Sequence, residues 1–252
     1  SMYNKIIKWS IYLLVFLLPV FFLPFSFEAF EFNKQYLLFF LVSLAFFAWL
    51  AKMILVDKEI RFKRSPLDLF VLAFLFIAIL SAVFSVDKGS SLFGFHGRFS
   101  DGLIGLLSLG ILYFLITNNV SADKEQKMGT KETQNSVLQV RSLVKIFLWS
   151  VFVIVLFSYL SIFGIWARLA DFQFTVGNFQ IGLPAVMAQW TFNPTAGSME
   201  GLTVFLAVII VLITGYLIVE ERKEFSKLAS WFLIFASFTL LAIIDFTPAW
   251  LV

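Results

Sequence analysis

Seven apolar runs alternate with polar segments along the 252 residues of this chain. A helix rises about 1.5 Å per residue, so a run of 20 residues spans roughly 30 Å, the thickness of bilayer hydrocarbon. The runs are Trp9–Phe27, Tyr36–Val56, Leu67–Val86, Gly102–Thr117, Leu143–Ile165, Gly201–Val219 and Leu228–Val252. The pattern predicts an all-α, polytopic transmembrane helix bundle with about seven spans.

The third and fourth runs predict a transmembrane hairpin. Leu67–Val86 has 20 residues, and Gly102–Thr117 has only 16, so the second helix is expected to borrow flanking residues or to thin the bilayer locally. The short connection between them is rich in glycine and charge. Its titratable residues are Asp87, Lys88, His96, Arg98 and Asp101.

The segment Trp166–Glu200 is too polar to span the membrane and too apolar for a solvated linker. Its glycines and prolines break regular structure, and Trp166 and Trp190 suit the headgroup level of a membrane. We expect an irregular outer segment between spans five and six, with short interfacial helices. By contrast, Asn118–Arg141 is polar and predicts a flexible loop.

The basic residues predict the orientation of the bundle. If the N-terminus is cytoplasmic, 15 of the 19 lysines and arginines lie in inner segments, and every inner segment carries some. The four outer basic residues are Lys34, Lys88, Arg98 and Arg168. Removing one helix would break this alternation, so the charges predict seven spans, with the N-terminus inside and the C-terminus outside.

Composition excludes several classes of protein. The chain is 60% hydrophobic and only 14% charged, against roughly 25% charged residues in soluble domains, so lipid must cover much of its surface. We therefore expect residues 1–252 to form a single transmembrane domain. The absence of cysteine and the single histidine argue against a metal site. A net charge of +3 is too small to indicate nucleic acid as a partner.

Candidate chemistry lies in the outer segments. Arg98 and Arg168 could each hold phosphate oxygens in a bidentate fork, and we expect them to converge on one outer site for a pyrophosphate. Alternatively, each anchors lipid headgroups or pairs with a nearby carboxylate, Asp101 or Asp171. His96 could act as a general base or could make only a structural polar contact.

The start of the third run is interpreted as structural. Ser65 as a cap, Pro66 at the first helical position and Asp68 in the first turn make an ordinary helix N-terminus. No phosphate-binding loop, dinucleotide fingerprint, zinc helix or nucleophile elbow occurs in the sequence.

The predicted hairpin resembles the O-antigen ligase and O-antigen polymerase-like family of bacterial membrane proteins. That family has a PLDL-type helix start, a helix ending LxSxxFSxD and a loop of the type SxxGxxGRxxG. The matching residues are Pro66, Leu67, Asp68, Ser81, Phe84, Ser85, Asp87, Ser91, Gly94, Gly97, Arg98 and Gly102. A second patch, around Asn193 and Pro194, resembles the family's Asn-Pro segment before a helix.

The resemblance implies a glycosyltransferase of the bacterial cytoplasmic (inner) membrane. Such a protein moves a glycan from an undecaprenyl-pyrophosphate carrier to a glycan, lipid or protein acceptor outside the membrane, without a cofactor or metal. The candidate substrate-binding residues are Arg98, Arg168, His96 and Asn193. No catalytic residue is assigned.

Two departures from the family pattern bear on function. The family's arginine shortly before the Asn-Pro pair is missing here, and the chain stops inside its seventh run. We therefore expect the N-terminal portion of a longer protein, with the catalytic base beyond residue 252. The alternatives are a polytopic transporter or lipid-linked-glycan flippase without bond chemistry, and a non-enzymatic membrane scaffold.

Overall fold

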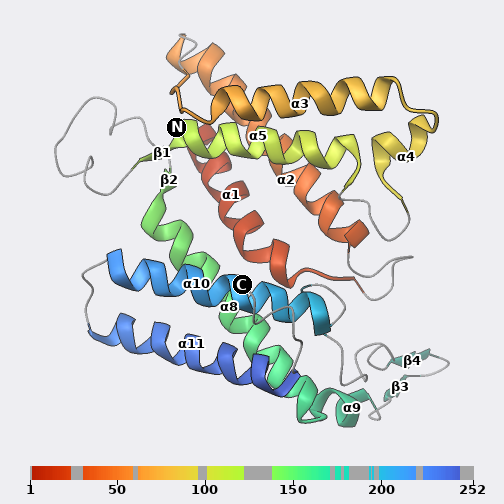
Figure 1. The fold of residues 1–252 in the computed structure, drawn as a ribbon, viewed down its shortest axis with the longest axis vertical. Coiled ribbons are helices and arrows are strands. Elements are labelled where there is room, and N and C mark those ends of the chain that lie inside the picture. The colour runs from red at the N-terminus through yellow and green to blue at the C-terminus, as the bar shows by residue number, and fades with distance from the viewer. Residues whose placement is uncertain are drawn as a thin grey trace. The chain divides into compact units, whose positions relative to one another are not determined.

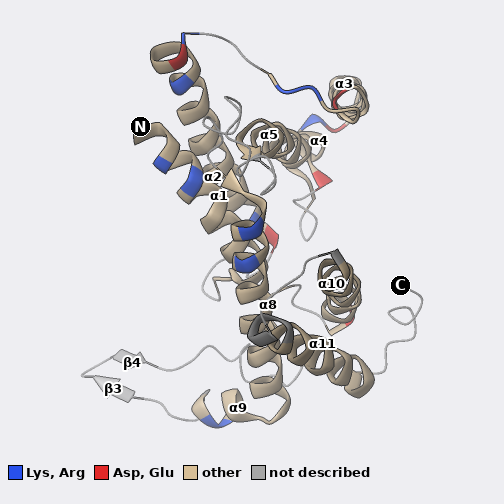
Figure 2. Cartoon of the chain, turned by 90° about the vertical axis from the view of Figure 1, so that its left-hand side faces the viewer, with Lys and Arg blue, Asp and Glu red and all other residues tan. Residues whose placement is uncertain are grey.

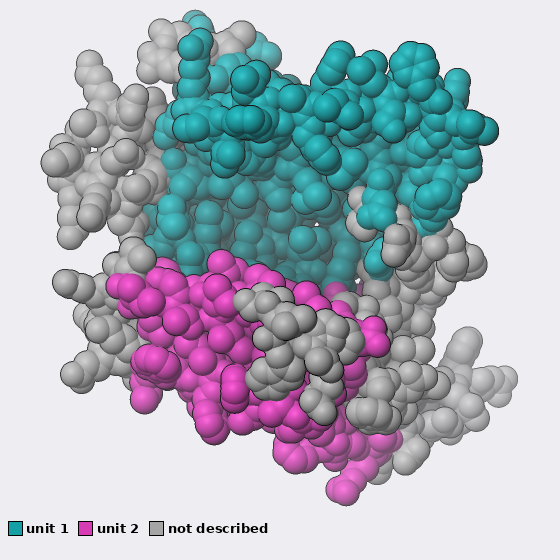
Figure 3. Space-filling model, viewed as in Figure 1, with its two compact units in different colours: residues 1–21, 31–150 teal, residues 22–30, 151–252 magenta. Residues whose placement is uncertain are grey.

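The chain divides into two compact units in a computed structural model (Figures 1 and 3). Unit 1 comprises residues 1–21 and 31–150, and unit 2 comprises residues 22–30 and 151–252. The structure describes residues 2–23, 31–58, 62–95, 101–121, 138–170, 174–176, 179–181, 193, 195, 199–219 and 224–244. The single transmembrane domain expected from composition stays a prediction.

Unit 1 is built from helices α1 to α5. Their bounds are α1 Met2–Val20, α2 Glu31–Lys52, α3 Asp68–Val83, α4 Lys88–Phe93 and α5 Leu103–Asn119, and a π-helix, η1 Met53–Asp57, extends α2. A parallel pair of two-residue strands, β1 Val120–Ser121 and β2 Leu138–Gln139, joins the two ends of the polar segment after α5. Helix α8, Val140–Ile162, begins in unit 1 and continues into unit 2.

Unit 2 contains the remaining elements. They are α9 Ile165–Ala170, β3 Phe174–Val176, β4 Phe179–Ile181, α10 Met199–Val219 and α11 Glu224–Ile244. Strands β3 and β4 pair in antiparallel fashion, with Thr175 opposite Gln180.

The predicted helical membrane class is confirmed. Four described helices are long and apolar enough to cross a membrane: Met2–Val20, Glu31–Asp57, Val140–Ile162 and Met199–Ile218. Asp68–Val83, Leu103–Asn119 and Leu228–Ile244 are apolar but shorter. Charged residues concentrate near helix ends and connections, while most helical surface is uncharged (Figure 2). Seven spans and a cytoplasmic N-terminus stay predictions.

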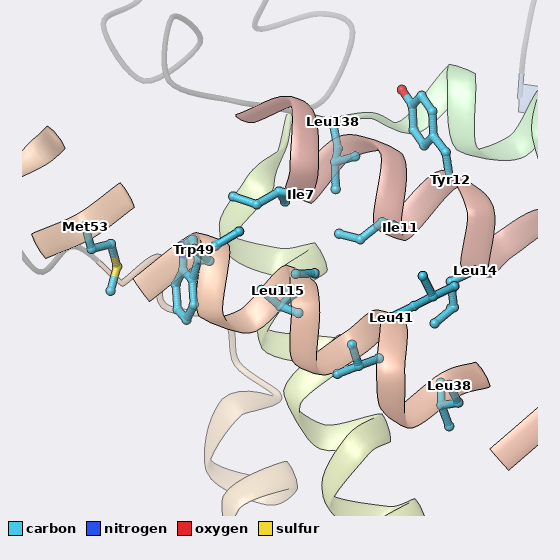
Figure 4. Close-up of a cluster of buried hydrophobic side chains, with 13 residues drawn as sticks. Ile7, Ile11, Tyr12, Leu14, Leu38, Leu41, Trp49, Met53, Leu115 and Leu138 are labelled. Carbon is cyan, nitrogen blue, oxygen red and sulfur yellow. The ribbon is translucent and has the colours of Figure 1, made fainter. Parts of the chain in front are cut away.

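The core of unit 1 lies between α1 and α2 (Figure 4). Ile7, Ile11 and Leu14 form one stripe of α1, because residues three, four and seven apart share a helix face. The facing stripe of α2 includes small residues, Ala45 and Ala48. Small side chains let helices approach closely within lipid, where packing rather than exclusion of water drives association.

Within unit 2, α10 packs against α11, and α8 makes contacts with α11 and α9. The Tyr159 hydroxyl on α8 donates to the Ala236 carbonyl at 2.9 Å and also contacts the Thr239 hydroxyl. Gly164, at φ +67°, lets the chain reverse after α8, and Trp166 then stacks on Phe157 with ring centroids 4.6 Å apart. The indole of Trp166 therefore packs against α8, and its place at the headgroup level of a membrane stays a prediction.

Two sequence expectations need correction. Helix α1 begins at Met2, well before Trp9, because Ile7 is already part of the stripe buried against α2. The segment Trp166–Glu200 was expected to be irregular with short interfacial helices, and its described part holds most of the short helix α9 but also β3 and β4, which were not expected. The signal was present: β-branched and aromatic residues flank Gly177-Asn178, a dipeptide typical of two-residue hairpin turns. Its membrane association stays a prediction.

The predicted orientation leads to a labelling test. A cysteine replacing Lys127 should react with an impermeant maleimide only from the cytoplasmic side, and one replacing Ser90 only from outside. The parent chain contains no cysteine, so each variant carries a single reactive thiol. Labelling intact cells and inside-out vesicles measures both, and the reverse pattern at either position would refute the orientation.

Candidate functional site

The candidate site is the tip of the hairpin formed by α3, α4 and α5 in unit 1.

At the opposite end of this hairpin, the Asp68 carboxylate accepts from the Ser65 backbone N–H at 2.7 Å and from the Tyr113 hydroxyl at 3.0 Å. The first contact joins the first turn of α3 to the segment before it. Helix α3 begins at Asp68, with Leu67 as its N-cap and no side-chain cap, so the predicted cap at Ser65 and the predicted first helical position at Pro66 are wrong. The second contact joins α3 to α5. The predicted place of Asp68 in the first turn of α3 is confirmed.

A second set of contacts fixes the same end. The Lys63 backbone N–H donates to Asn118 Oδ1 at 2.7 Å, and Lys63 Nζ donates to the Val120 carbonyl at 3.2 Å. Val120 itself pairs with Leu138 in the parallel strand pair. The segment before α3, the end of α5 and the start of α8 are therefore tied together.

Close packing along the hairpin depends on Gly110. A Cβ at this position would lie 2.5 Å from Leu75 Cδ1, far inside van der Waals contact. Leu75 on α3 therefore occupies the space that a side chain on α5 would take. Because glycine has no side chain, α3 and α5 can approach each other closely at Gly110.

The turn from α3 to α4 is organised by Asp87. Its carboxylate caps α4, accepting from the Ser90 backbone N–H at 3.2 Å and from the Ser90 hydroxyl at 2.6 Å. The Ser90 hydroxyl, helped by the backbone N–H groups of Ser90 and Gly89, holds the pKa of Asp87 below its usual value. Ser85 donates to the Asp87 carbonyl and accepts from the Ser91 hydroxyl.

The segment 94–102, which we call the tip loop, is closed at its base. A Cβ on Gly102 would lie 2.5 Å from Gly94 N, 2.7 Å from Phe93 C and 2.8 Å from Leu92 O. The backbone at the start of α5 thus touches the backbone at the end of α4. Gly94 also adopts φ +83°, a conformation that favours glycine. Steric constraints therefore explain why glycine occupies the motif positions 94 and 102.

The structure describes two of the four candidate site residues, Arg168 and Asn193. His96 and Arg98 belong to the tip loop but lie outside the described residues. Arg168 is exposed on α9 in unit 2. Asn193, also in unit 2, is fully buried, so a ligand touching it would have to enter the protein interior. Convergence of Arg98 and Arg168 stays a prediction.

Several residues that build the hairpin were not singled out from sequence. Tyr113, Lys63 and Asn118 each find a partner at least 45 positions away. The only sequence feature that could have indicated these contacts was the position of each polar residue near the end of an apolar run. Among the described residues, no group of three or more His, Asp or Glu side chains could hold a metal ion.

Comparison with known proteins gives no relative: no family model, curated protein or solved structure matches the chain. Helical structure and apolar composition define the protein as a polytopic helical membrane protein. Any finer assignment depends on the residues of the hairpin.

Proposed function

We propose that this protein takes part in transfer of a glycan from an undecaprenyl-pyrophosphate carrier to an acceptor, at the outer face of a bacterial cytoplasmic membrane. The observation that carries the proposal is the closed base of the tip loop. Gly94 and Gly102 bring the ends of α4 and α5 into backbone contact, and the intervening residues include His96 and Arg98. A loop with fixed ends can present a guanidinium with little loss of conformational freedom.

The chemistry requires stabilisation of a leaving group. In the transfer step, the bond between the sugar's anomeric carbon and the pyrophosphate oxygen breaks, and a bond forms from that carbon to an acceptor hydroxyl oxygen. The hydroxyl proton passes to a base, and undecaprenyl pyrophosphate departs with its negative charge. Arg98 is suited to bind that pyrophosphate, because its planar fork can hold two oxygens and remains charged at all physiological pH values.

A transfer assay tests this function. The protein is produced in its native cell and in cells lacking it, and membranes are supplied with a radiolabelled undecaprenyl-pyrophosphate glycan and acceptor. We expect labelled acceptor only when the protein is present. Movement of the carrier across the membrane without any labelled acceptor would instead identify a flippase and would refute bond chemistry.

A further inference from the structure

The end of the hairpin opposite the tip loop carries a basic surface that the proposed glycan transfer does not use. Lys58, Lys63 and Arg64 are exposed there, and we call these three residues the basic patch. They belong to the connection from η1 to α3, and Figure 2 shows basic residues leading into α3. The stretch 52–64 contains five basic and two acidic residues, so this connection has a net positive charge.

Contacts with α2 and with the end of α5 hold the patch in place. The ring of Phe62 meets the ring of Trp49 edge-on, with centroids 5.5 Å apart. On the other side, the Lys63 backbone N–H donates to Asn118 Oδ1 at 2.7 Å, and Lys63 Nζ donates to the Val120 carbonyl at 3.2 Å. An ammonium group has three donors, so Lys63 can also donate to a bound anion. A segment held in this way loses little conformational freedom when it binds a ligand.

The nearest described carboxylates along the chain have partners outside the patch. Asp57 Oδ2 lies 4.0 Å from Nζ of the buried Lys52. The Asp68 carboxylate accepts from the Ser65 backbone N–H and from the Tyr113 hydroxyl. The positive charge of the patch therefore remains available to an external anion.

Exposed apolar side chains on both sides of the patch indicate that this anion belongs to a lipid. Leu55 on η1 is 63% exposed, and Leu67 and Leu69 at the start of α3 are 58% and 73% exposed. In a helical membrane protein, such side chains contact the acyl chains of the bilayer. Basic residues between two lipid-facing segments lie at the level of the phospholipid headgroups.

We propose that the basic patch binds the headgroup of an anionic phospholipid. Lys58, Lys63 and Arg64 surround its phosphate, and its acyl chains lie along the exposed apolar side chains of η1 and α3. A zwitterionic phospholipid carries the same phosphate, but its own ammonium group cancels the charge, so it binds the patch more weakly. The bound lipid joins the end of η1 to the start of α3.

A comparison of two lipids with identical acyl chains tests the choice of headgroup. The full chain is purified in mild detergent and titrated with phosphatidylglycerol or with phosphatidylcholine, and native mass spectrometry measures the fraction of protein that retains lipid. We expect the wild type to retain phosphatidylglycerol about tenfold better or more, because each basic residue at a lipid surface contributes roughly fivefold. Equal retention of the two lipids would overturn the proposal.

Single substitutions test the place of binding. Lys58→Gln should lower the preference for phosphatidylglycerol roughly fivefold, whereas Lys58→Arg, which keeps the charge, should retain it. Lys88→Gln is the matched control, because it also removes one exposed lysine, but from α4 at the other end of the hairpin. An unchanged preference in Lys58→Gln, or an equal loss in Lys88→Gln, would show that the patch does not select the lipid.

Competition with glycerol 3-phosphate distinguishes a lipid from a soluble phosphate. This compound has the phosphate but no acyl chains, so at equal concentration it should leave phosphatidylglycerol bound. Displacement of the lipid would assign the patch to a soluble phosphate compound and would overturn the proposal.

Discussion

Replacing Gly102 by alanine is expected to lower the unfolding temperature of the protein in detergent by roughly 2–10 °C, corresponding to about 1–3 kcal/mol for an overpacked site. The new Cβ would lie 2.5 Å from Gly94 N and 2.7 Å from Phe93 C. Both are backbone atoms, so a rotamer change cannot relieve the clash. The ends of α4 and α5 would have to separate, which opens the base of the tip loop.

Gly89→Ala is the matched control for this substitution. A Cβ at Gly89 meets only Asp87 Oδ1, at the ordinary contact distance of 3.5 Å. Because Gly89 lies within α4, alanine there should leave stability unchanged or raise it slightly through its better helix propensity. Equal unfolding temperatures for Gly102→Ala and the wild type would show that the base of the loop is not tightly packed.

Arg98→Lys is expected to reduce glycan transfer about tenfold or more, while membrane levels of the protein remain normal. Lysine keeps the positive charge but loses the planar fork that binds two pyrophosphate oxygens. Loss of a donor that stabilises transition-state charge commonly costs about 10²–10³ in rate, and the retained charge of lysine should recover part of this. The transfer assay with labelled carrier measures the effect.

Arg64→Lys is the control for the arginine substitution. Arg64 is exposed and lies in a segment predicted to face the cytoplasm, away from the outer surface. Its replacement should leave transfer near the wild-type rate. If Arg98→Lys also retains near-normal transfer, Arg98 only anchors lipid headgroups, and the proposed binding of the pyrophosphate by its guanidinium is refuted.

The helices of this protein were predictable because hydropathy is a local property. Each apolar run contains one long described helix, and the hairpin was expected from α3, its polar connection and α5. Boundaries were less predictable. Helix α1 extends to Met2 and α2 begins at Glu31, because contacts between helices stabilise turns that the apolar runs leave out.

The candidate site was only partly predictable. The resemblance to the family motif identified Asp87, Ser91, Gly94 and Gly102 as residues of interest. It did not explain why those residue types occur at those positions. The structure supplies local reasons: a helix cap at Asp87 and backbone contact at Gly102. The sequence did not predict the groove lined by Phe32, Gln35, Tyr36, Phe39, Phe93 and Ile104, because its residues on α2 begin before the apolar run and its other wall comes from α4 and α5.

The sequence by itself determined that this is a helical membrane protein, because the length and composition of each run are properties of consecutive residues. Only the tertiary structure decided which helices pair and how closely. Asp68 meets Tyr113 across 45 positions, and Gly110 makes room for Leu75. All helices in lipid are similarly apolar, so hydropathy does not select among partners. Small residues and a few polar contacts between distant segments make that choice.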